Sequence, residues 1–275
     1  MRIFIEGVGV LGAGLSGWQA SQPILAGTAP YLQAALVIPP SDLLPSAERR
    51  RTGLPVKLAL AIGCEAIAQS QRNASELPAV FASSAGDGDN MHYIFDMLSQ
   101  NGHEVSPTRF HNSVHNAPSG YWSIATKSMA PTTSLTCFDT SFVAGLIEAA
   151  TQTLASGNAG VLIAYDAPYP QPLHTARPIN ATFGVALVLT GNKTNRSLAE
   201  LEISISRNSN ADTPIAHTEL EAMRIGTPAA RSLPLLAALA KLNPEKIGTP
   251  KKIAQAKIYF DYIAGNQLDV VVRPC

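Results

Sequence analysis

Short apolar segments alternate along this chain with longer segments whose apolar residues recur every three or four positions. The first pattern is typical of buried strands and the second of helices that pack against a core. The expected strands are residues 2–6, 78–83, 160–165, 185–189 and 201–205, the expected helices are 54–69, 140–154 and 232–242, and a terminal hairpin pairs 257–263 with 268–272. Strands that alternate with helices predict an α/β protein of layered architecture.

The length of 275 residues fits one large domain or two small ones. The largely polar stretch 192–210 is the best candidate for a boundary between a first half, 1–190, and a second half, 191–275. The chain carries 20 basic and 20 acidic residues, so it has no net charge. This balance excludes a general nucleic-acid binder and a binder of anionic membranes. Only 15% of the residues are charged, so the surface is expected to be sparse in charge, and the near-zero net charge favours association into an oligomer.

The N-terminal region resembles a signal peptide or a membrane span, because no charged residue occurs between Gly7 and Ser41. Glycines and prolines interrupt this stretch, however, and they would break a continuous helix in lipid. We therefore expect no membrane span. The three cysteines, Cys64, Cys137 and Cys275, are far apart and odd in number, which gives neither a disulfide framework nor a paired metal site. A cytoplasmic location follows as the expectation.

The sequence Gly7-x-Gly9-x-x-Gly12 follows a predicted strand and matches the dinucleotide-binding pattern. Two further requirements of that pattern fail. Residues 13–23 are too rich in glycine and proline for a good helix, and no acidic residue follows about twenty positions later. A structural glycine turn is the preferred interpretation, and an NAD(P)-binding oxidoreductase is kept as a third hypothesis.

Cys137 lies directly before a predicted helix, where backbone N–H groups favour a thiolate. That is a suitable position for the nucleophile of an acyl-transfer enzyme. A free cysteine is, however, more often a small buried apolar residue. The spacing alone leaves both interpretations open.

His111 and His115 have the i, i+4 spacing of two metal ligands on a helix. Pro107, Pro118 and Gly120 surround them, and no third ligand is nearby, so we expect no metal site. The run 49–51, three arginines, could contact a phosphate but is more typical of a solvated helix edge.

Several segments together resemble β-ketoacyl synthases, which share the thiolase fold. They are RIFIEGVGVLGAG, ERRRTGLPVKLALAIGCEAI, PAVFASSAGD, SPTRFHNSVHNAPSGYWSIA, TSLTCFDTSFVAGLIEAA, GVLIAYDAPYP and FGVALVLTGN, in the order found in that family. The chain is most similar to the short branch from aryl-polyene pigment clusters, in particular to its chain-length-factor subunit. The resemblance is good over residues 1–190 and implies a thiolase-like layered α/β/α/β/α fold. Its second half, 191–275, is shortened and packs on the same core as part of a single unit.

The chain departs from the catalytic members of this family at the elbow that holds the reactive cysteine. Matching Thr136 to the family's Thr-Ala-Cys elbow puts Cys137 at the alanine and Phe138 at the nucleophile position. A register one residue earlier would make Cys137 the nucleophile. The only histidine after residue 180 is His217, which lacks the Gly-Thr that follows the family's catalytic histidine. The resemblance therefore implies a subunit that does not condense substrates alone.

The leading hypothesis is a non-catalytic, chain-length-factor-like subunit that forms a heterodimer with a catalytic β-ketoacyl synthase. It would shape the tunnel for the growing acyl or polyene chain and meet an acyl carrier protein transiently. No cofactor, metal or nucleic acid is expected. The alternative is an active acyltransferase that uses Cys137 as its nucleophile. The residues that the resemblance implies at the interface or tunnel are Phe110, His111, His115, Asn116, Cys137, Phe138 and Asp139.

Overall fold

A computed structural model describes residues 1–84, 86–100, 104–207, 210–242 and 255–275. The strands are β1 (Arg2–Gly12), β2 (Leu15–Ser16), β3 (Ala79–Ala82), β4 (Thr132–Leu135), β5 (Gly160–Asp166), β6 (Phe183–Thr190), β7 (Ala199–Ser206), β8 (Ala256–Asp261) and β9 (Gln267–Pro274). Within the described ranges they form one mixed sheet in the order β4-β3-β5-β6-β1-β7-β9-β8, with β2 paired to β1. Of the neighbouring strands in this described sheet, β3–β4 and β3–β5 are the parallel pairs.

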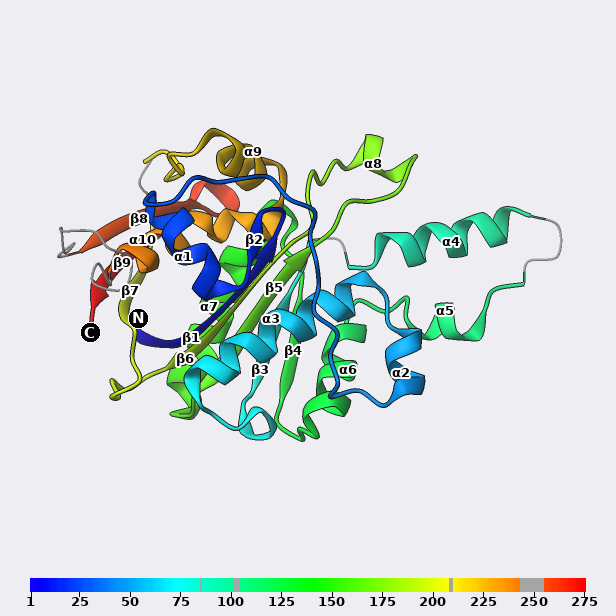
Figure 1. Ribbon diagram of the computed structural model, residues 1–275, viewed down its shortest axis with the longest axis horizontal. Coiled ribbons are helices and arrows are strands. Elements are labelled where there is room, and N and C mark those ends of the chain that lie inside the picture. The colour runs from blue at the N-terminus through cyan, green and yellow to red at the C-terminus, as the bar shows by residue number, and fades with distance from the viewer. Residues whose placement is uncertain (85, 101–103, 208–209, 243–254) are drawn as a thin grey trace.

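Helices cover both faces of this sheet (Figure 1). The α-helices are α1 (Trp18–Ala26), α2 (Ser46–Arg51), α3 (Leu54–Ser70), α4 (Gly88–Ser99), α5 (Pro107–His111), α6 (Ala117–Thr126), α7 (Ser141–Ser156), α8 (Leu173–Ala176), α9 (Thr218–Gly226) and α10 (Leu233–Lys241). The short 3₁₀ turns among the described residues are η1 (Ala74–Glu76), η2 (Phe138–Thr140), η3 (Pro228–Ser232) and η4 (Ile263–Gly265). None of the helices in the described ranges is both long and apolar enough to cross a bilayer.

Alternate residues of the central strands point to opposite faces of the sheet and belong to two hydrophobic cores. Phe81 of β3 packs with Trp122 of α6 and with α3 on one face. Val80 of the same strand faces α7 on the other, in the core that also includes α10. The far end of the sheet turns back toward that second helical layer, because Phe260 of β8 meets Phe142 of α7 edge to face at 5.8 Å. This arrangement of helical and sheet layers confirms the expected layered α/β class.

The predicted helices 54–69, 140–154 and 232–242 are present as α3, α7 and α10, and the predicted terminal hairpin is β8 and β9 joined through η4. Strand β7 lies inside the polar stretch 192–210 and pairs with both β1 and β9.

The predicted glycine turn is wrong, because β1 continues without a break through Gly12. Its glycines allow close packing of α3. A Cβ atom on Gly7 would lie 2.0 Å from the carbonyl oxygen of Ala66, and one on Gly9 would lie 2.0 Å from that of Ile62. A strand pressed against a helix in this way offers no loop for a pyrophosphate.

The expectation that residues 13–23 are too rich in glycine and proline for a helix is also wrong in part, since α1 begins at Trp18 and contains Pro23. Tertiary packing explains the difference. Trp18, Ser21 and Leu25 are buried on one side of α1, where the helix packs along α10. Burial of that side overrides the weak intrinsic propensity.

Candidate functional site

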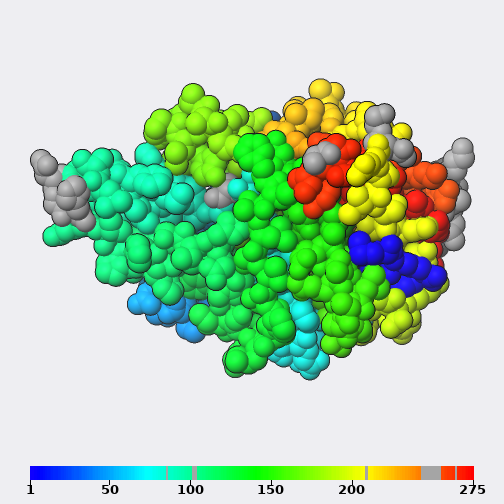
Figure 2. Space-filling view, turned by 180° about the vertical axis from the view of Figure 1, so that it is seen from behind, coloured from blue at the N-terminus to red at the C-terminus, as the bar shows by residue number. Residues whose placement is uncertain are grey.

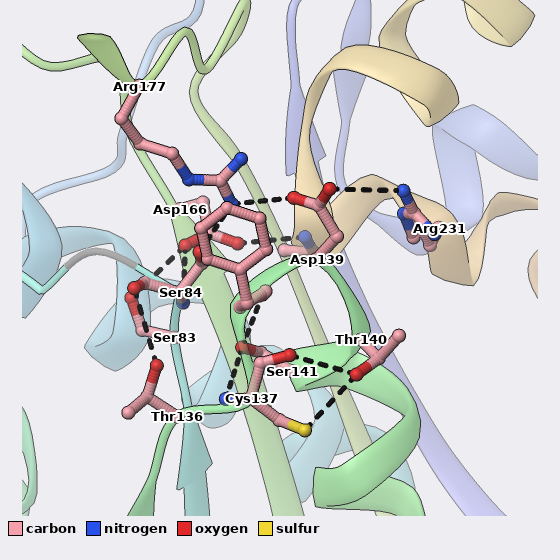
Figure 3. Close-up of polar contacts among 12 residues, drawn as sticks. Ser83, Ser84, Thr136, Cys137, Asp139, Thr140, Ser141, Asp166, Arg177 and Arg231 are labelled. Carbon is pink, nitrogen blue, oxygen red and sulfur yellow. Dashed lines mark hydrogen bonds and ion pairs between the residues drawn. The ribbon is translucent and has the colours of Figure 1, made fainter. Parts of the chain in front are cut away.

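The carboxyl ends of the three parallel strands meet at one edge of the sheet. Ser83 and Ser84 follow β3, Thr136 and Cys137 follow β4, and β5 ends at Asp166. Because parallel strands point the same way, the residues after them are brought together, as Figure 3 shows. The Thr136 hydroxyl donates to the carbonyl oxygen of Ser84 at 3.3 Å. Segments more than fifty residues apart in sequence therefore form one polar site.

The elbow between β4 and α7 turns sharply at Phe138, whose backbone is left-handed with φ of 51°. This conformation is unfavourable for a residue with a side chain, and neighbouring groups must hold it. Ser141 does so, because its hydroxyl accepts a hydrogen bond from the N–H of Cys137 at 2.9 Å and donates to the carbonyl oxygen of Phe138 at 2.7 Å. Phe138 is 63% exposed.

The Cys137 thiol is in contact with a neighbouring hydroxyl group of the elbow. The Thr140 hydroxyl lies 3.1 Å from its sulfur and donates to the Cys137 carbonyl oxygen at 2.8 Å. The 3₁₀ turn η2 separates this cysteine from α7, which begins at Ser141. Cys137 therefore does not lie directly before α7, as the sequence suggested. Burial first, and then Cys137, raise the pKa of the nearby Tyr262 hydroxyl.

Asp139 lies between two arginines. Its carboxylate is 2.6 Å from Nη2 of Arg177 and 3.6 Å from Nη2 of Arg231. Arg177 also donates to the Ser84 hydroxyl at 2.8 Å, and its guanidinium carbon lies 3.7 Å from the centre of the Phe138 ring. The segment that carries α8 is thereby joined to the elbow (Figure 3).

Asp166 is a buried carboxylate at the centre of the site. It accepts hydrogen bonds from the N–H of Ser84 and the N–H of Ala229, both at 2.8 Å, and from the Ser83 hydroxyl at 3.2 Å. It therefore connects the ends of β3 and β5 with η3. Burial raises its pKa to about 7, although these donors and the charge of Arg177 act in the opposite direction.

We predict that Asp166 makes stability depend on pH between about 4 and about 7. In this range the folded chain keeps a proton that an unfolded aspartic acid, with a pKa near 3.9, has released. The free energy of unfolding should then fall as the pH rises, by at most about 1.4 kcal/mol per pH unit for one group. Urea unfolding at pH 5, 6 and 7 should show a smaller fall in Asp166→Asn than in the wild type. Equal slopes in the two proteins would contradict the prediction.

Phe110 and His111 lie on a projecting arm formed by α4 and α5, and His115 and Asn116 lie between α5 and α6. Phe110 is 68% exposed, and His111 and Asn116 are also exposed. His115 turns inward, with Nε2 3.1 Å from the carbonyl oxygen of Ser83. Because α5 ends at His111, the two histidines do not share the helix that a metal-binding pair requires. Figure 2 shows from behind that the arm projects at the same end of the molecule as the α8 segment.

Sequence reasoning therefore selected Cys137, Phe138 and Asp139, the consecutive residues of the elbow, but it missed Arg177 and Asp166. Asp166 did carry a signal, since it is a charged residue at the end of a fully apolar strand. No local pattern identifies Arg177, which lies 38 residues after Asp139 in the chain.

A comparison with known protein families identifies the family of this chain. A family model described as the N-terminal domain of β-ketoacyl synthases matches residues 18–241, most of the chain. The chain belongs to the β-ketoacyl synthase family. Both the expected resemblance and the thiolase-like fold class are thus confirmed. A search of curated proteins found no match.

Solved structures of ketosynthases share the fold of this family member. A chain from the complex of the ketosynthase ApeO with its chain length factor ApeC, from Xenorhabdus doucetiae, has a TM-score of 0.70 and 20% identity, covering 98% of this chain and 99% of that one. The AntDE:AntF complex, a type II polyketide ketosynthase with its acyl carrier protein, gives 0.74 and 11%, covering 100% and 99%. A module 1 ketosynthase of bacillaene synthase from Bacillus amyloliquefaciens gives 0.68 and 9%, covering 100% and 76%. At these identities the similarity shows the fold alone.

Proposed function

We propose that this chain is a non-catalytic, chain-length-factor-like subunit that pairs with a catalytic β-ketoacyl synthase and shapes its acyl tunnel. The left-handed backbone of Phe138 carries this proposal. A strained turn between strand and helix is where a nucleophile elbow presents its reacting side chain. In the register that matches Thr136 to the family's threonine, that side chain is a benzyl group, which cannot attack an acyl group.

The surroundings of Cys137 support the same proposal. In the part of the chain that the structure describes, the side chains that bond to Cys137 are the hydroxyl groups of Thr140 and Ser141, and neither is a general base at neutral pH. A cysteine nucleophile normally has a histidine or another base close by. His115, the histidine nearest to Cys137 in sequence, lies instead with Nε2 3.1 Å from the Ser83 carbonyl oxygen.

The partner would bind at the free edge of β4. This strand pairs only with β3 in the described sheet, and an unpaired edge is a ready surface for strand addition. Apolar side chains flank it: Met129 is 97% exposed and Ile124 is 50% exposed. The arm that carries Phe110 would extend this surface toward the partner.

An acyl carrier protein is a further partner in the proposal. Exposed cations would suit an acidic carrier. Arg50 lines two adjoining cavities: one of about 410 Å³ that Lys57 also lines, and one of about 300 Å³ that Arg109 also lines.

We predict that Ser134→Pro weakens the heterodimer but not the fold. Ala79 and Ser83 donate to the carbonyls of Pro131 and Leu135, so alternate residues of β4 face β3 and Ser134 directs its own N–H outward. Proline removes that donor from the open edge. Size-exclusion chromatography of the co-expressed pair should show dissociation, with the melting temperature of the isolated chain almost unchanged. Met129→Glu puts a charge beside the same edge and should also dissociate the pair. If neither variant dissociates the pair, the proposed interface is wrong.

Co-expression with the catalytic synthase tests the proposed function itself. The two chains should co-purify as a one-to-one complex, and condensing activity should require the partner's nucleophile. A chain that stays monomeric beside that enzyme would exclude the proposal. Incubation with an acyl-carrier substrate followed by mass spectrometry tests the alternative enzyme, because an acyl adduct on Cys137 would support it.

A further inference from the structure

Arg177 makes three contacts with the elbow through one flat guanidinium group. The group lies over the Phe138 ring at 3.7 Å, pairs with the Asp139 carboxylate at 2.6 Å and donates to the Ser84 hydroxyl at 2.8 Å. A guanidinium can stack on an aromatic face while its edge forms hydrogen bonds, whereas a lysine ammonium cannot do both.

The groups that hold Arg177 are themselves fixed. The N–H of Ser84 donates to the buried Asp166 at 2.8 Å. The second carboxylate oxygen of Asp139 is 3.6 Å from Arg231, which approaches it from η3. The guanidinium is therefore anchored at two points that do not depend on Phe138.

The Phe138 ring, in contrast, is not held by packing in a hydrophobic core. It is 63% exposed and lies outside both hydrophobic cores. The left-handed backbone sets the direction in which the side chain leaves the elbow. It does not fix the side-chain rotamer, so the stacked guanidinium is the contact that selects one ring position.

We infer that Arg177 is a positioning residue that holds the Phe138 ring where the ring ends the acyl tunnel, and thereby helps to set product chain length. The inference rests on the proposed function and adds a residue to it. Arg177 touches no reacting atom and acts through Phe138.

The first test follows the ring in the isolated full-length chain. The protein is labelled with 4-fluorophenylalanine, and Phe138→Leu identifies the Phe138 signal by its loss from the ¹⁹F spectrum. Arg177→Lys keeps the charge and can keep the ion pair with Asp139, but it loses the stacked face. The Phe138 signal should sharpen and move toward that of an exposed, mobile ring. Arg2→Lys is the matched control, because the Arg2 guanidinium lies 5.4 Å from the ring of Phe4, far from the elbow in the sheet. It should leave the Phe138 signal in place.

The second test measures product lengths made by the complex with the catalytic synthase. Arg177→Lys should shift the distribution toward longer chains while turnover persists, in the same direction as Phe138→Ala. An unmoved Phe138 signal in Arg177→Lys would overturn the inference. So would unchanged product lengths in Arg177→Lys when Phe138→Ala changes them, and in that case the proposed function would stand. If neither variant changes product length in an assembled, active complex, the tunnel function and the inference both fail.

Discussion

Phe138→Ala is expected to lengthen the products of the assembled pair while leaving it active. The ring projects from the tip of the elbow and is 63% exposed, so its removal opens space without emptying the core. The free energy of unfolding should change by less than about 1 kcal/mol, as for most substitutions outside the core. Chromatography of products from the reconstituted pair would show the shift toward longer chains, and chemical denaturation would show that the chain stays folded.

Cys137→Ala is the control for this experiment, because it changes the neighbouring residue and the only sulfur at the elbow. It removes one thiol that contacts Thr140 and should cost about 1 kcal/mol of stability. If no covalent chemistry passes through this sulfur, the pair should keep both its turnover and its product lengths. The alternative enzyme predicts the reverse pattern, in which Cys137→Ala abolishes turnover and Phe138→Ala hardly changes product length. Loss of all activity in Cys137→Ala with the dimer still assembled would refute the non-catalytic subunit.

The sequence was sufficient to predict those parts of the fold whose signals are local. The periodicity of α3 and α7 and the alternating hairpin β8–β9 reflect burial of one side of each element, and this leaves a pattern in the residues themselves. The elbow was located from the start of the predicted helix 140–154 and from the family resemblance at Thr136, whereas the short strand β4 before it was not predicted.

The remaining features depend on contacts between distant segments. The pattern Gly7-x-Gly9 is the same whether the glycines are needed for a turn or for a closely packed helix. The atoms that show the second case are the carbonyl oxygens of Ala66 and Ile62, more than fifty residues away in the chain. The stacking of Arg177 on Phe138 joins residues 39 positions apart and leaves no periodic trace. The position of the elbow could therefore be predicted from the helix that follows it and from the family resemblance, but the charged residues that contact it could not.

Gly9→Ala is expected to be the most damaging single substitution proposed for this chain. The added Cβ atom would lie 2.0 Å from the carbonyl oxygen of Ile62 and 2.9 Å from its carbon. Both are backbone atoms of the buried helix α3, so no side chain can turn away to make room. Either α3 or β1 must move, and because both belong to the packed core, the free energy of unfolding should fall by about 3 kcal/mol or more. Urea denaturation of the purified variant measures this loss.

Gly120→Ala provides the matched control, since it adds the same methyl group to a glycine of the helix α6. No atom lies within 4 Å of the added Cβ, and alanine favours a helix, so this variant should be more stable than the wild type by about 0.5–1 kcal/mol. The opposite signs separate steric conflict from any general effect of replacing glycine. If Gly9→Ala were as stable as the wild type, and nucleotide raised the melting temperature of the wild-type chain, the glycines would serve a ligand rather than α3. We expect neither result, because the carbonyls of α3 already occupy the space that a pyrophosphate would need.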